Sequence, residues 1–192
     1  MFTHLKNLLA LFSVLLLVYS GCNDDDPASS GDPGPGEEEL ITTVTLTLTD
    51  ASDANNIVTV QWRDDDGPGG NDPVIGTLTL MAGTTYNGSI QLLNEQENPA
   101  ENITEEVEEE SDAHQFFYTA EGDIAARVAI AYTDQDGNGL PVGLSFTVTV
   151  SAGGAVSGTL NVVLSHFDEI AKDGTSKSNE TDVDIDLPVN II

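Results

Sequence analysis

The sequence is poor in basic residues. Only five of its 192 residues are Lys or Arg, whereas 33 are Asp or Glu, and the formal net charge is −28 at pH 7. Phosphate backbones are bound through clustered Lys and Arg, so this balance excludes nucleic acid as a partner. It equally excludes electrostatic adsorption to anionic lipids. The excess of carboxylates makes cations the natural counter-charge of the protein.

Cysteine and long apolar runs are also scarce. The only cysteine, Cys22, has no partner for an intramolecular disulfide. The longest apolar run, Leu8 to Ser20, is too short for an ordinary membrane span and follows Lys6, as in a secretory signal. The stretch Ser20-Gly21-Cys22 resembles the lipobox of bacterial lipoproteins, which implies that residues 1–21 are a signal peptide and that Cys22 is lipidated. The alternative is a plain secretory signal with a chance cysteine nearby.

Residues 22–39 lack any apolar periodicity. They combine Asp24-Asp25-Asp26, a Pro- and Gly-rich middle and Glu37-Glu38-Glu39. This composition predicts a disordered linker whose self-repulsion extends it. The acidic run after the cysteine resembles the surface-export signal of Bacteroidetes lipoproteins, which implies the cell surface. A generic acidic tether facing the periplasm is the alternative.

Residues 40–192 carry the pattern of β-strands. Val44, Leu46 and Leu48, for example, alternate with threonines, and β-branched residues are abundant throughout. A period of two predicts strands with one buried and one wet face, as in antiparallel sheets. We therefore expect a single all-β domain of about nine strands.

The chain also resembles itself when it is shifted by 70 residues. Residues 58–94 share ten identities with residues 128–164, including aspartates and glycines of the loops. This indicates two four-stranded repeats, at about 41–98 and 111–168, and a closing strand at 182–191. The repeats predict either an antiparallel β-sandwich of two such sheets or a closed barrel.

Each repeat contains a loop rich in Asp and Gly. Carboxylates two residues apart, followed by glycine, can aim several oxygens inward, and calcium prefers oxygen ligands. The same residues are standard in hairpin turns and then need no ion, which is the alternative. The candidate calcium ligands are Asp64, Asp66 and Asp72 in the first loop and Asp134, Asp136 and Asn138 in the second.

Two histidines, His114 and His166, remain in the predicted mature chain, and both lie near strand ends. Together, beside carboxylates, they could ligate a transition metal or haem iron. The alternative is two unrelated surface residues. The acidic run from Glu105 to Glu110 favours a solvated segment, with a short helix after Asn102 as the alternative.

Catalytic constellations are missing from the sequence. No Ser/His/Asp set is identifiable, and the Gly-rich turns lack the lysine and following helix of a phosphate loop. We therefore expect a non-enzymatic protein.

Three stretches carry a further resemblance: residues 38–44, residues 99–110 with 114–118, and residues 139–144. They resemble small flavobacterial-type outer-membrane lipoproteins that often carry the label "type 1 periplasmic binding fold superfamily protein". The label implies a two-lobed α/β architecture, whereas the strand pattern of this chain predicts β structure. Such lipoproteins often accompany TonB-dependent outer-membrane transporters, and the resemblance implies such a partner here.

These observations predict a lipid-anchored surface protein that binds a ligand for an outer-membrane transporter. The second hypothesis is an immunoglobulin-like adhesion or envelope module with calcium-stiffened loops. The third is a lipocalin-like barrel around an apolar ligand. The sequence leaves the ligand and the oligomeric state open.

Overall fold

The computed structural model describes residues 39–168 and 170–192. The predicted signal peptide, Cys22 and all of the linker except Glu39 lie outside the described residues. The described elements are β1 (Thr43–Asp50), β2 (Ile57–Arg63), β3 (Val74–Ile75), β4 (Leu78–Leu80), β5 (Thr85–Leu93), α1 (Ile103–Glu109), β6 (His114–Gly122), β7 (Val128–Tyr132), β8 (Ser145–Val150), β9 (Val156–His166) and β10 (Glu180–Ile191).

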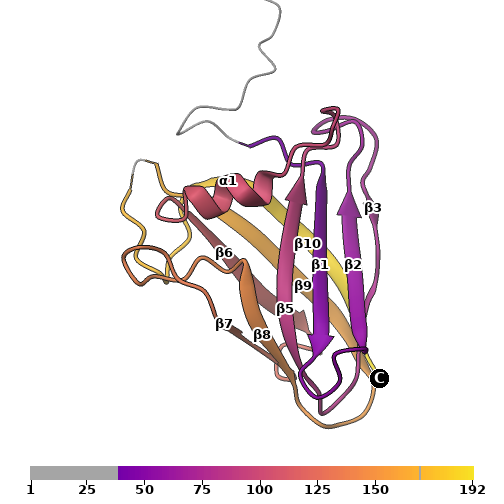
Figure 1. Cartoon of the computed structure of the whole chain (residues 1–192). Helices are drawn as coiled ribbons and strands as arrows, with labels where there is room; N and C mark the ends of the chain where they lie inside the picture. The colour runs from indigo at the N-terminus through magenta and orange to yellow at the C-terminus, as the bar shows by residue number, and fades with distance from the viewer. Residues whose placement is uncertain (1–38, 169) are drawn as a thin grey trace, which may run out of the picture. The chain divides into compact units, whose positions relative to one another are not determined.

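The strands form two sheets, which Figure 1 shows as separate layers. One sheet has six strands in the order β3-β2-β1-β5-β8-β7, and the other has four in the order β4-β10-β9-β6. The inward residues of the alternating pattern, such as Leu46, Leu48, Val162, Leu164 and Leu187, belong to one core between the sheets. The fold is therefore sandwich-like and mostly β, as the alternation predicted.

The structure refines several details of the predicted fold. The described residues form ten strands, where about nine were expected, and the two sheets stay open, which favours the sandwich over the closed barrel. One pair, β4 with β10, is parallel, although only antiparallel pairs were expected. Alternation shows which side chains face inward, but it does not show which edge of a strand finds a partner.

The two repeats do not form one sheet each. β1 and its counterpart β6, 70 residues later, lie in different sheets, and β4 and its counterpart β8 do as well. The pairs β1–β5 and β6–β9 are both antiparallel. However, β2 pairs with β1, whereas its counterpart β7 pairs with β8. Each repeat thus contributes to both layers.

The acidic run forms the short helix α1 rather than only a solvated segment. Ile103 and Val107 lie one turn apart on the helix and are both buried. The Thr104 hydroxyl accepts a hydrogen bond from the Leu92 amide (2.8 Å) and donates one to the Leu92 carbonyl (3.2 Å), which fixes the helix to β5. Within the described residues, no helix is long and apolar enough to cross a membrane.

Candidate metal centre

Strands β6 and β9 place the two histidines side by side. His114 and His166 are directly opposite in the antiparallel register, so their side chains share one face of the sheet. That face continues through Phe116 and Leu164 into the core, and both imidazoles are buried. The rings stack with their centroids 4.5 Å apart and an angle of 27° between their planes.

A β-bulge in β10 brings Asp182 to these histidines. Thr181 pairs with Ser165 and Val183 pairs with Leu164, so Asp182 is an extra residue with no partner on β9. Such a bulge re-aims a side chain that regular alternation would point elsewhere. The Asp182 carboxylate is fully buried, with Oδ2 3.6 Å from His114 Nε2 and Oδ1 3.7 Å from His166 Nδ1.

The fourth member, Glu39, precedes β1. Its Oε1 lies 3.1 Å from His114 Nε2, and its side chain is 4% exposed. The residues that follow it hold the segment in place. Ile41 is buried in the core, and the Thr42 amide donates to the Leu93 carbonyl (3.0 Å). Glu39 therefore belongs to the folded domain, although its composition placed it at the end of the linker.

These four side chains, which we call the quartet (Glu39, His114, His166 and Asp182), can each offer one ligand atom, and these atoms all lie within 4.8 Å of one another. The quartet is the only group of three or more converging His, Cys, Asp or Glu residues among those the structure describes. In a tetrahedral zinc site, ligand atoms about 2.0 Å from the metal stand about 3.3 Å apart. The closest Glu39–His114 contact, 3.1 Å, is already near that spacing.

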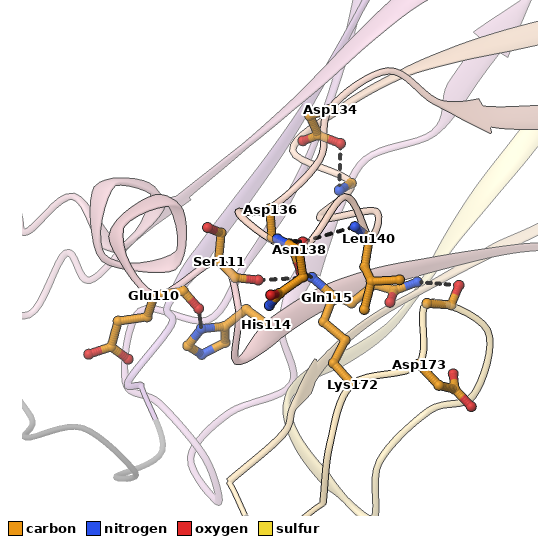
Figure 2. Close-up of polar contacts among 12 residues, drawn as sticks. Glu110, Ser111, His114, Gln115, Asp134, Asp136, Asn138, Leu140, Lys172 and Asp173 are labelled. Carbon is orange, nitrogen blue, oxygen red and sulfur yellow. Dashed lines mark hydrogen bonds and ion pairs between the residues drawn. The ribbon is translucent and has the colours of Figure 1, made fainter.

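The hydrogen bonds of His114 leave one ring nitrogen available to the quartet. Its Nδ1 lies 3.1 Å from the Glu110 carbonyl oxygen, just past the end of α1 (Figure 2). A carbonyl can only accept, so Nδ1 carries the proton and Nε2 points to the carboxylates. Metal-bound histidines are usually oriented in this way by a second hydrogen bond.

Several buried polar atoms of the quartet have no hydrogen-bond partner. They are Glu39 Oε2, His114 Nε2, His166 Nε2 and both carboxylate oxygens of Asp182. Buried polar atoms are nearly always satisfied, because leaving one unpaired carries a large desolvation penalty. Because such atoms are concentrated at one point, the quartet could hold a further group such as a metal ion.

The quartet perturbs the pKa values of its own members. Burial, followed by the neighbouring Glu39 carboxylate, raises the pKa of Asp182 to about 8. Burial opposes the charge of His114, but Glu39 and Asp182 outweigh it and raise the His114 pKa above 6.5. Burial likewise opposes the charge of Glu39, but the neighbouring His114 and Asp182 side chains lower its pKa. The protonated forms of Asp182 and His114 are therefore favoured.

The second Asp loop is closed by the protein itself. Lys172 Nζ lies 2.8 Å from Asp136 Oδ2 and donates to the Ser111 carbonyl at 2.8 Å (Figure 2). Asp136 Oδ1 accepts from the amides of Asn138 and Leu140 at 2.8 and 2.9 Å. A lysine therefore supplies the positive charge that was expected from calcium, which favours the turn interpretation.

Asp134 and Asp66 also accept hydrogen bonds from amides of their own loops. The Asp134 carboxylate accepts hydrogen bonds from the amides of Gly143 (2.8 Å) and Ser145 (2.9 Å). In the first loop, Asp66 accepts from the amide of Asn71 at 3.0 Å. Asp64 is buried, whereas Asp72 is exposed. Calcium binding by the first loop stays a hypothesis. Among the described residues, no group of three carboxylates converges in this loop.

Sequence reasoning identified half of the quartet. It selected His114 and His166, which the structure brings together, and missed Glu39 and Asp182. Glu39 was hidden in an acidic run, and Asp182 was hidden in a strand whose other aspartates, Asp184 and Asp186, are exposed. Comparisons with protein families, curated proteins and solved structures give no match for this chain.

Proposed function

We propose that the chain is a non-enzymatic, lipid-anchored binding protein that holds a divalent transition metal in the quartet. The observation that carries the proposal is the convergence of two imidazoles and two carboxylates, all buried, with unsatisfied atoms directed at one another. Two buried carboxylates this close together repel each other when both are ionised, and burial adds a desolvation penalty. A divalent cation removes this penalty by satisfying both carboxylates and both imidazoles at once.

The donor set selects the class of metal. Two nitrogen and two carboxylate donors suit zinc, iron or a similar transition metal. Calcium takes six to eight oxygen ligands, which the quartet does not provide. Thiolate-seeking metals are disfavoured because the only cysteine of the chain is Cys22. The quartet therefore favours zinc and its neighbours over calcium.

The cellular setting of the proposal comes from the sequence. A lipidated Cys22 would anchor the protein in the outer membrane, with the acidic linker extending the sandwich from the cell surface and a TonB-dependent transporter as partner. The lipobox-like residues and the acidic run support this setting. Cys22→Ala is expected to abolish fatty-acid labelling and release the protein from membranes. Labelling that persists in this variant would contradict the anchor.

A second candidate function is a structural envelope module with a resident metal. The enclosure of the quartet favours it, since no side chain in it is more than 4% exposed. Closed sites with four protein ligands are typical of structural zinc, whereas a delivered metal must leave. The two functions differ in how quickly metal exchanges.

Metal titration tests the shared part of the proposal. The mature chain, carrying Cys22→Ser for solubility, should bind one equivalent of Zn²⁺ or Co²⁺. His166→Ala and Asp182→Asn should weaken binding by at least about 100-fold, because each removes a direct ligand. Asp184→Asn, on the exposed face of the same strand, is the matched control and should bind normally. Equal binding by all variants would refute the site.

A further inference from the structure

The four donors of the quartet differ in how firmly the fold holds them. His114 and His166 are locked by the ladder between β6 and β9, and Asp182 lies in the bulge of β10, which pairs with β9. Moving any of these three requires paired strands of the four-stranded sheet to separate. Glu39 instead lies in residues 39–42, which we call the strap, outside every helix and strand.

Thr42 makes four hydrogen bonds between the strap and the sandwich. Its backbone bonds at Thr42 run from the Thr42 amide to the Leu93 carbonyl (3.0 Å) and from the Asp64 amide to the Thr42 carbonyl (2.8 Å). The Thr42 hydroxyl adds a bond to the Leu93 carbonyl at 3.2 Å and one from the Glu95 amide at 2.8 Å. Ile41 is buried, but Leu40 is 38% exposed.

One small cavity of the described chain adjoins the quartet at His166. This cavity of about 40 Å³ is also lined by Ile170, Ser178, Asn179 and Glu180. A space of this size admits a few water molecules at most, since one water needs about 10–15 Å³ of such volume. A hydrated metal ion, which carries several waters, does not fit through it.

We infer that the strap is the gate of the metal site and that Glu39 is its exchangeable ligand. This inference rests on the proposed function. When the strap lifts at Thr42, Glu39 leaves and Ile41 uncovers the end of the core, while the other three donors stay in place. Metal then enters or leaves a site of two histidines and one carboxylate, and closure of the strap restores the fourth ligand.

The gate predicts a kinetic effect that loss of a ligand alone does not produce. Thr42→Val removes the two side-chain hydrogen bonds that hold the strap but leaves all four donors intact. It should speed both Co²⁺ association and Co²⁺ release to a chelator by about tenfold, as expected for one to two lost hydrogen bonds. The equilibrium Kd should change far less than either rate. Glu39→Gln, in contrast, should speed release and weaken equilibrium binding.

Thr104→Val is the matched control. Thr104 makes the same kind of bond pair as Thr42, to the amide and carbonyl of Leu92, but holds α1 rather than the strap. Its exchange rates should match those of the parent chain. Stopped-flow mixing of the mature Cys22→Ser chain with Co²⁺, and of the loaded protein with EDTA, measures both rates.

The outcomes separate the inference from the proposed function. If the parent chain binds neither Co²⁺ nor Zn²⁺, the proposed function fails. If the parent chain binds Co²⁺ but Thr42→Val exchanges at the parent rate, the gate is refuted and the metal site stands. The gate is also refuted if Thr104→Val speeds exchange as much as Thr42→Val, or if widening the cavity with Ile170→Ala does so.

Discussion

The fold opposes the ionisation of Asp182. Its pKa is raised to about 8 by burial and by Glu39, and the His114 pKa is also raised, by Glu39 and Asp182 acting against burial. A raised folded-state pKa gives stability that is fully present below the unfolded pKa and is lost as the pH rises through the folded pKa. Both groups therefore act in the same direction.

The metal-free protein should accordingly become less stable as the pH rises from about 5 to about 8. Urea unfolding in the presence of chelator measures this slope. Asp182→Asn should flatten it, because the amide has the shape of the acid but does not ionise. Asp184→Asn should keep the slope, since Asp184 is exposed. A slope unchanged by Asp182→Asn, or of opposite sign, would contradict the assignment of the raised pKa.

Lys172 and Asp136 form a second buried contact between charged side chains. Their side chains are 2% and 0% exposed, and the nitrogen and oxygen are 2.8 Å apart. Lys172→Met leaves Asp136 buried without its counter-charge, which should lower the free energy of unfolding by about 3–5 kcal/mol. Lys177→Met removes an exposed lysine and should change it by less than about 0.5 kcal/mol.

Urea unfolding at pH 7 compares the two lysine variants. Added calcium should not restore the stability of the Lys172→Met variant, because backbone amides as well as the lysine occupy the carboxylate of Asp136. Full rescue by calcium would show that the loop is an ion site after all.

Among the four residues of the quartet, only the two histidines were predicted from the sequence. Residue type and position near strand ends were enough to select His114 and His166. Predicting Asp182 would have required knowing the position of the β-bulge. The bulge depends on how β10 pairs with β9, and no local sequence pattern indicates it. Glu39 required knowledge that the chain folds back onto His114, a contact between residues far apart in sequence.

At the scale of elements, the contact between β6 and β9 depends on a close backbone approach. Gly158 pairs with Gly122, and a Cβ atom at position 158 would lie 2.2 Å from the Glu121 carbonyl oxygen. Gly158→Ala should therefore destabilise the protein by about 1–3 kcal/mol, as overpacking does.

Gly154→Ala is the control for this substitution. No heavy atom lies within 4 Å of a Cβ at position 154, so this change should be neutral or slightly stabilising. The thermal unfolding midpoints of the Gly158→Ala and Gly154→Ala variants test this difference. Equal midpoints would show that β6 and β9 can move apart without penalty.

Strand location was predictable, whereas strand pairing was not. Alternation such as Val44-Leu46-Leu48 marks a buried face from local sequence, and these residues are all buried. The two-residue strand β3 is too short to show a period, and the parallel β4–β10 pair joins residues about a hundred positions apart. The duplication of a four-stranded unit stays a prediction, because the sequence match does not carry over to matching sheets.

At the scale of the whole molecule, the candidate metal site lies at one end of the core of the sandwich-like fold. Three donors come from the four-stranded sheet, and the fourth comes from the segment that leads towards Cys22 in the sequence. Metal binding would therefore tie the beginning of the folded domain to β6, β9 and β10. The strap gate and the second candidate function both depend on this connection.

Metal binding by the quartet is tested most directly by the thermal unfolding midpoint of the mature Cys22→Ser chain. The midpoint is measured with chelator, with Zn²⁺ and with Ca²⁺. Binding to the folded state at 100 times Kd adds about 2.7 kcal/mol, which corresponds to about 5–10 °C for a domain of this size. We expect that rise with Zn²⁺, little change with Ca²⁺, and no Zn²⁺ effect in the His166→Ala, Asp182→Asn double variant. No rise with Zn²⁺, or an equal rise in the double variant, would contradict the proposed metal site.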